Sequence, residues 1–333
     1  MITASIHEAL LWRTRTMTNA IDRLQAKIMA GHTIIMDGGT GTEIPRRGVP
    51  IHPDLAWSAN ANITSPDLVR DIHRDYIHAG AEIIITNTFS TSRVTLAIDG
   101  LSGQTEEINL QSVRLAMDAR KLCDAEDTVV IAGSISAFEP KGHPEIMPPY
   151  EEALADYREQ VTILAGAGVD LIVLEMFTRT VDLKAAIDAA TETGLPIWVG
   201  LSCESYHGQI YLGLMGRHGG ETIGEAVAAS SSPNVQAFFI MHSPPEVTAE
   251  ALRELKNYTS LPLGAYAHGG GDRVQIGQAQ KISGGHWASG TDSQNYLDYA
   301  REWISCGATI IGGCCGITPE HISALSEGLD LAG

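Results

Sequence analysis

The sequence predicts an α/β fold, a (β/α)₈ TIM barrel in a single domain that is preceded by a helical extension. Three observations support this prediction: eight short apolar runs occur along the chain, each leads into a polar residue or a glycine, and segments of helical character separate them. Continuous apolar runs are typical of strands that are buried on both faces, as in a parallel sheet. Eight strand–helix units in series match a closed barrel, and a doubly wound open sheet is the alternative topology.

The predicted strands are rich in β-branched and aliphatic residues, which favour extended backbone. In chain order they are Thr33–Asp37, Glu82–Thr88, Thr128–Ser134, Asp170–Glu175, Pro196–Ser202, Val235–His242, Leu261–His268 and Thr309–Cys315. Between them, stretches such as 65–81 and 150–169 repeat apolar residues at helical spacing and close on a glycine, which predicts helices. We therefore assign residues 1–30 to the helical extension and residues 31–333 to the barrel.

Charge and cysteine content exclude several classes of protein. The 333 residues carry 40 acidic and 22 basic side chains, a net charge of −18, which argues against nucleic acid or an anionic membrane as the main partner. No apolar run approaches the roughly 20 residues that span a bilayer. Five cysteines, an odd number in a long chain, favour a reducing cytoplasm over a disulfide framework. We expect small-molecule partners, and an assembly of identical chains stays open.

Polar side chains stand at the predicted strand ends, where barrel enzymes carry their active sites. They are Asp37, Asn87, Ser134, Glu175, Ser202, His242, His268, and the pair Cys314 and Cys315.

The two adjacent cysteines, Cys314 and Cys315, lie between glycines near the end of the chain. Neighbouring residues of a strand point to opposite faces, so both sulfurs can serve one site only if the strand ends or kinks there. Gly312, Gly313 and Gly316 allow such a kink. A protein-bound zinc needs at least three protein ligands, which leaves a third ligand to find.

The ends of strands six and seven offer His242 and His268 as the third ligand. Strands six, seven and eight are neighbours in a barrel, so both histidines would meet the cysteine pair at one rim. Two thiolates and one imidazole form a known catalytic zinc set with an open fourth position. The alternative is an inert cysteine pair at a tight glycine turn, with solvated histidines.

Five motifs resemble, in order and spacing, those of the zinc-dependent homocysteine S-methyltransferases. They are DGGTGTEI from Asp37, WSANANITSPDLVRDIHRDYIHAGAEIIITNTF from Trp57, AGSI from Ala132, LEMF from Leu174 and GGCCG from Gly312. The resemblance extends from about Thr33 to the C-terminus, and the second motif looks closest to the S-methylmethionine-dependent branch. It implies methyl transfer from a sulfonium or quaternary ammonium donor, such as S-methylmethionine, S-adenosylmethionine or a betaine, to the thiol of homocysteine, giving methionine.

The resemblance also implies roles for residues of the barrel mouth. Asp37 and Glu175 match the carboxylates that hold the ammonium group of homocysteine, as opposite charges attract in a partly dry cleft. The backbone amides around Gly38, Gly39 and Thr40 would hold its α-carboxylate, because oriented N–H groups bind anions.

Three further positions are expected to contact substrate. Trp57 matches a family tryptophan near the methyl donor, and an indole face attracts a methylated cation by roughly 0.5–2 kcal/mol. Asn87 and Ser134 match family positions at the rim of the barrel.

The sequence departs from the family at the metal site. The family usually holds its metal with the GGCC pair and a cysteine of an Asn-Cys dipeptide on strand six, where this chain has Met241 and His242. We expect Zn²⁺ to be bound by His242, Cys314 and Cys315, which would be the catalytic residues, with His268 as a weaker candidate ligand. Three other functions stay open: a relative acting on a different thiol or selenol, a zinc-dependent barrel hydrolase, and a zinc-free redox sensor.

Overall fold

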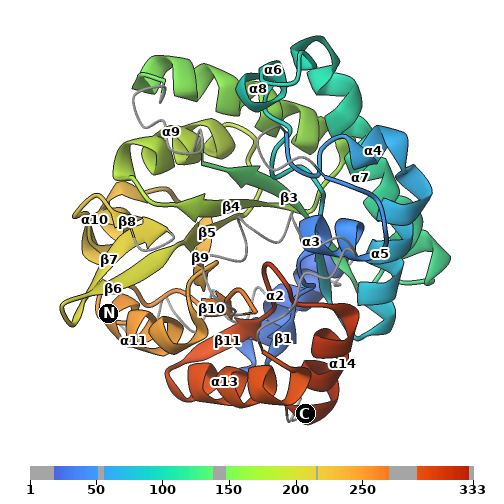
Figure 1. Ribbon diagram of the computed structural model, residues 1–333. Helices are drawn as coiled ribbons and strands as arrows, with labels where there is room; N and C mark the ends of the chain where they lie inside the picture. The colour runs from blue at the N-terminus through green and yellow to red at the C-terminus, as the bar shows by residue number, and fades with distance from the viewer. Residues whose placement is uncertain (1–18, 52–55, 138–147, 215–216, 270–290, 330–333) are drawn as a thin grey trace, which may run out of the picture.

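The computed structural model describes residues 19–51, 56–137, 148–214, 217–269 and 291–329. Eight parallel strands form one sheet in the order β1-β11-β10-β9-β5-β4-β3-β2, with helices around it (Figure 1). Their bounds are β1 Ile34–Ile35, β2 Ile83–Ile85, β3 Val130–Ser136, β4 Leu171–Phe177, β5 Ile197–Leu201, β9 Val235–Met241, β10 Leu263–Tyr266 and β11 Ala308–Ile311. Each predicted run overlaps one of these strands, although β3 and β4 extend two residues beyond their runs and β11 begins one residue before its run.

The sheet closes on itself between its first and last strands. Met36 forms a parallel bridge with Ile83, Asp37 N donates to Ile83 O over 2.9 Å, and Glu82 N donates to Ile35 O over 2.8 Å. The (β/α)₈ barrel is therefore confirmed, and the open doubly wound sheet is wrong.

The helices follow the strands in the alternation that a barrel requires. They are α2 Ala20–Met29, α3 Thr40–Arg46, α4 Ala61–Thr64, α5 Pro66–His78, α6 Arg93–Ala97, α7 Thr105–Leu122, α8 Tyr150–Ala167, α9 Thr180–Thr191, α10 Ile223–Ala229, α11 Pro245–Leu255, α13 Ser293–Ser305 and α14 Pro319–Gly328. No helix among the described residues is both long and apolar enough to cross a membrane.

Two large apolar cores stabilise the barrel, and a third, small cluster contains Ala56, Ala59, Leu96 and Ile108. The larger core lies between strands and helices. The smaller core fills the barrel interior with inward-facing side chains such as Met36, Trp198 and Phe239, and Leu24 of α2 belongs to the same cluster. Helix α2, the described part of the predicted extension, thus buries its apolar face against the barrel interior. The domain boundary at residue 30 stays a prediction.

A small antiparallel sheet that the sequence analysis missed follows β5. It consists of β6 Cys203–Tyr206, β7 Gln209–Leu214 and β8 Arg217–His218. A tight turn joins β6 to β7, with His207 and Gly208 both at positive φ. Cys203 starts this sheet and is completely buried.

Candidate metal and substrate site

Three of the predicted metal ligands lie together. The ligand atoms of His242, Cys314 and Cys315 are all within 4.8 Å of one another, and no other cluster of at least three such ligands occurs in the described part of the chain. Nδ1 of His242 lies 3.2 Å from Sγ of Cys314. The donor set, two sulfurs and one imidazole, fits the requirements of zinc.

The cysteine pair stands on a loop that begins where β11 ends. Backbone hydrogen bonds fix this loop: Gly313 N donates to Asp37 O and Cys314 N to Ala267 O, both over 2.9 Å, and Gly269 N donates to Cys315 O over 2.8 Å. Strand β11 ends at Ile311, four residues before the predicted end at Cys315, so neither cysteine lies in a strand. This early end lets both sulfurs serve one site.

The glycines of the loop have two different functions. Gly316 has a φ of 80°, which a side chain would strain. Gly312 and Gly313 are needed for close packing: a Cβ would lie 2.6 Å from Met36 Cβ at Gly312 and 2.1 Å from Ile317 Cγ2 at Gly313. The expected kink therefore occurs at Gly316, whereas the other two glycines let the loop pack against its neighbours.

His242 follows β9 with a φ of 46°. Its N–H donates to Tyr266 O over 3.1 Å, and the N–H of His268 donates to Ser243 O over 3.3 Å, so the backbones stay paired beyond the strand ends. The rings of His242 and His268 are 5.6 Å apart. His268 is outside the cluster of three ligands, which agrees with its rank as the weaker candidate.

The two thiols differ in their electrostatic environment. Contact with the Cys314 thiol, and with His242, holds the pKa of Cys315 well below its ordinary value. The same contact between the thiols, together with burial, raises the pKa of Cys314. One thiolate is therefore favoured in this cluster before any cation is considered.

Asp37 and Glu175 are buried carboxyl groups of the barrel mouth. Burial raises the pKa of Asp37 well above its ordinary value, and Glu175 raises it further. Burial also raises the pKa of Glu175 to about 7, although a hydrogen bond donated by Ser134 opposes this change. Two such groups favour a cationic ligand, because a cation offsets the cost of ionising them where water is excluded.

Some buried polar atoms of the mouth have no hydrogen-bond partner among the described residues. Asp37 Oδ2 accepts from Ile85 N over 2.8 Å, but Asp37 Oδ1 has no such partner. The same holds for Thr40 Oγ1. Buried polar groups are normally paired, so these atoms point to a polar ligand. The sequence analysis missed Tyr266, whose buried hydroxyl is close enough to Glu175 to raise its own pKa further.

In the glycine loop after β1, backbone N–H groups already donate hydrogen bonds within the protein. Gly39 N donates to Ile317 O and Thr40 N to Gly38 O, both over 3.0 Å. Both amides therefore have backbone acceptors in this structure, and the binding of a carboxylate by the loop from Gly38 to Thr40 stays a prediction. The glycines also allow close packing, since a Cβ on Gly39 would lie 2.6 Å from Cys314 O.

The other predicted substrate residues differ in their contacts. Asn87 donates both amide hydrogens, to Ser58 O and to Asn62 Oδ1, and accepts from Ser58 Oγ, so it holds the loops together and has no N–H left for a ligand. Ser134 contacts Glu175 and thus belongs to the site. Trp57 is partly buried with a φ of 47°, and a Cβ on Gly41 would lie 2.4 Å from its Nε1.

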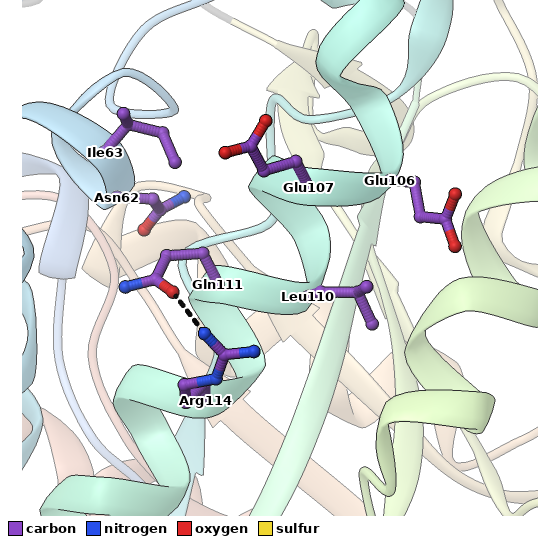
Figure 2. A pocket seen from close by; sticks show the side chains of 7 residues that line it. All are labelled: Asn62, Ile63, Glu106, Glu107, Leu110, Gln111 and Arg114. Carbon is purple, nitrogen blue, oxygen red and sulfur yellow. Dashed lines mark hydrogen bonds between the residues drawn. The ribbon is translucent and has the colours of Figure 1, made fainter.

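A hollow lies on the outer wall of the barrel, between α4 and α7 (Figure 2). Its lining residues are Asn62, Ile63, Glu106, Glu107, Leu110, Gln111 and Arg114. None of the predicted site residues is among them, so this hollow is separate from the candidate site formed by His242, Cys314 and Cys315.

Comparison with known proteins matches residues 34–329 to the family model described as homocysteine S-methyltransferase. Homocysteine S-methyltransferase 4 of Zea mays is 28% identical over 318 residues, covering 90% of each chain. Homocysteine S-methyltransferase of Escherichia coli (strain K12) is 29% identical over 318 residues, covering 91% of this chain and 97% of its own. Selenocysteine methyltransferase of Astragalus bisulcatus is 28% identical over 327 residues, covering 89% of this chain and 92% of its own.

A solved structure is similar to this chain throughout. The crystal structure of the homocysteine methyltransferase MmuM from Escherichia coli, in its metallated form, has a TM-score of 0.75 and 27% sequence identity. The match covers 92% of this chain and 99% of that one.

Proposed function

The chain belongs to the homocysteine S-methyltransferase family and is a methyltransferase, and we propose that it methylates the thiol of homocysteine to give methionine. We propose further that zinc is bound by His242, Cys314 and Cys315. The methyl donor would be a sulfonium or quaternary ammonium compound: S-methylmethionine, S-adenosylmethionine or a betaine. The observation that carries the proposal is the convergence of two thiols and one imidazole at the mouth of the barrel.

The donor set supports zinc, because two thiolates and one imidazole leave a fourth position for a substrate atom. Zinc bound in such a site supplies Lewis acidity that lowers the pKa of a thiol ligand. His242 contributes a neutral ring where the family usually has a thiolate, so the site carries one negative charge fewer. We expect the acceptor thiol to lose its proton more readily here, and the resulting sulfur to be a weaker nucleophile.

The residues of the barrel mouth would bind the amino-acid part of homocysteine. Asp37 and Glu175 would hold its ammonium group, and Asp37 Oδ1, without a partner among the described residues, is available to accept a hydrogen bond. The hydroxyl of Thr40 is a further polar group without such a partner, and the hydroxyl of Tyr266 lies beside Glu175. Ser134 would orient Glu175 through the hydrogen bond between them.

A selenol acceptor is the second candidate. Relatives named selenocysteine methyltransferase match nearly as much of the chain as the homocysteine enzymes do. A selenol is more acidic than a thiol and a stronger nucleophile, which would suit a site with His242 in place of a thiolate. The hydrolase and redox-sensor alternatives lose their support, because the family is one of methyltransferases.

The experiment measures zinc in the reduced, purified protein and then methyl transfer from each of the three donors. Homocysteine and selenocysteine are offered as acceptors in parallel, and product is detected by mass spectrometry. We expect about one zinc per chain and methionine from one donor. Metal-free protein with full activity would contradict the role of zinc. Methylation of selenocysteine but not of homocysteine would show that the acceptor is a selenol.

A further inference from the structure

Strand β4 contains a β-bulge at its site end, next to Glu175. Leu174 of β4 pairs with Val199 of β5, whereas Phe177 pairs with Leu201, so β4 has one extra residue in this interval. Met176 lies in the bulge with a φ of 61°. Residues with side chains rarely adopt this left-handed backbone, and bulges beside active sites commonly redirect a side chain.

The sulfur of Met241 accepts a hydrogen bond from the bulge. Met176 N donates to Met241 Sδ over 3.1 Å, and Ser202 Oγ lies 3.5 Å from the same sulfur. Met241 is the last residue of β9 and is 1% exposed. An N–H that leaves the strand ladder at a bulge needs another acceptor when it is shielded from water, and the thioether provides one.

Gly200 of β5, between the two methionines, leaves space for this contact. A Cβ on Gly200 would lie 2.9 Å from Met241 Cγ and 2.8 Å from the hydroxyl of Tyr266. The missing side chain thus lets Met241 reach across β5 to the bulge, and lets Tyr266 reach toward Glu175.

We propose that Met241 is a positioning residue for Glu175, acting through the peptide N–H of Met176. This inference rests on the proposed function, in which Glu175 holds the ammonium group of the acceptor. The sulfur fixes the peptide that follows Glu175 and so directs the carboxylate toward Ser134 and the mouth of the barrel. His242 follows Met241 directly, so the end of one strand would orient both the metal ligand and the clamp for the ammonium group.

The test replaces Met241 with leucine, which keeps an apolar side chain of similar volume and removes the sulfur. Loss of one hydrogen bond predicts a rise in KM for homocysteine of about three- to tenfold, with kcat and zinc content unchanged. The matched control is Met117→Leu, at a partly buried methionine of α7 on the outer wall, which should leave KM unchanged.

A double-mutant cycle with Met176→Gly distinguishes positioning from a general structural effect. Glycine adopts positive φ without strain, so the bulge should depend less on the sulfur. We expect Met241→Leu to change KM by less than about twofold in the Met176→Gly background. An undiminished effect in that background would overturn the inference, as would a loss of zinc in parallel with the rise in KM.

Wild-type turnover and the KM of Met241→Leu test the proposed function and the role of Met241 separately. A wild-type protein that does not methylate homocysteine contradicts the proposed function, and this inference with it. Wild-type turnover together with an unchanged KM in Met241→Leu contradicts the inference alone.

Discussion

Nδ1 of His242 and Sγ of Cys314 lie 3.2 Å apart although 72 residues separate them in the chain. The contact forms because β9 and β11 flank β10 and all three strands end at the same rim. The backbone of each ligand is held by hydrogen bonds to the strand between them, His242 N to Tyr266 O and Cys314 N to Ala267 O. Backbone hydrogen bonds therefore bring the two ligands to the same rim of the barrel.

Removing the imidazole of His242 should weaken zinc binding more than removing that of His268. His242→Ala leaves two sulfur ligands, and we expect the affinity for zinc to fall by at least about 100-fold, since loss of an outer partner alone typically costs 10–100-fold. Competition with a chromophoric chelator measures this. His268→Ala is the control and should stay within about tenfold of wild type. Loss of zinc in His268→Ala but not in His242→Ala would show that the ligand assignment is reversed.

Replacing His242 with cysteine should preserve zinc but change the acidity of the acceptor. A third thiolate adds a negative charge to the site, so the bound thiol should lose its proton at a higher pH than in wild type. Proton release on homocysteine binding, followed from pH 5 to 9 by calorimetry in two buffers, measures the difference. Identical profiles for wild type and His242→Cys would exclude an electronic role for the imidazole.

The barrel could be predicted because its strands are buried on both faces and therefore appear as continuous apolar runs. The ends of the strands were less predictable. β11 ends at Ile311 and not at Cys315, because Gly312 and Gly313 leave the strand to pack on Met36 and Ile317. The contact with Met36 joins residues 276 positions apart, which local patterns do not contain. The antiparallel sheet after β5 was missed because β6 follows β5 after a single residue and its sequence, Cys-Glu-Ser-Tyr, is not an apolar run.

The metal cluster could be predicted because few residue types bind zinc and the topology fixes which strands are neighbours. The contacts of Asn87 and of the amides of Gly39 and Thr40 were not predictable, since a polar residue at a rim serves a ligand or a loop equally well. Met176 gave no signal, and Met241 was noted only as a departure from the family's Asn-Cys dipeptide, because an apolar residue at a strand end looks like part of the core. A bulge is visible only once the register of both strands is known.

Neutralising Glu175 should weaken binding of the acceptor and remove a pH dependence. Glu175→Gln loses a charge-assisted hydrogen bond, and we expect KM for homocysteine to rise by about 10- to 100-fold. Burial raises the pKa of Glu175 to about 7, so the wild-type carboxyl ionises, and its affinity for an ammonium group rises, as the pH increases through 7.

A desamino analogue, 4-mercaptobutyrate, separates this effect from ionisation of the thiol. The ratio of its inhibition constant to the KM for homocysteine should increase between pH 6 and 8 in wild type and stay level in Glu175→Gln. A ratio that does not change with pH in wild type would contradict the role of Glu175 as the ammonium clamp.

His73 of α5 should make the protein sensitive to mild acid. Its ring is completely buried, and neither nitrogen has a hydrogen-bond partner among the described residues. Burial lowers the pKa of His73 from 6.5 to about 4. The unfolded chain therefore binds a proton that the folded protein does not, and the free energy of unfolding falls as the pH drops from about 6.5 toward 4, by about 2 kcal/mol at pH 5.

His73→Leu should remove this loss and also the two unpaired nitrogens. Urea unfolding at pH 7 and pH 5 measures the difference: wild type should lose about 2 kcal/mol more than His73→Leu between the two pH values. His32→Leu, at a partly exposed histidine between α2 and β1, is the control and should behave as wild type. Equal losses in wild type and His73→Leu would mean that the folded protein protonates His73 as readily as the unfolded chain does, with the ring reached by water.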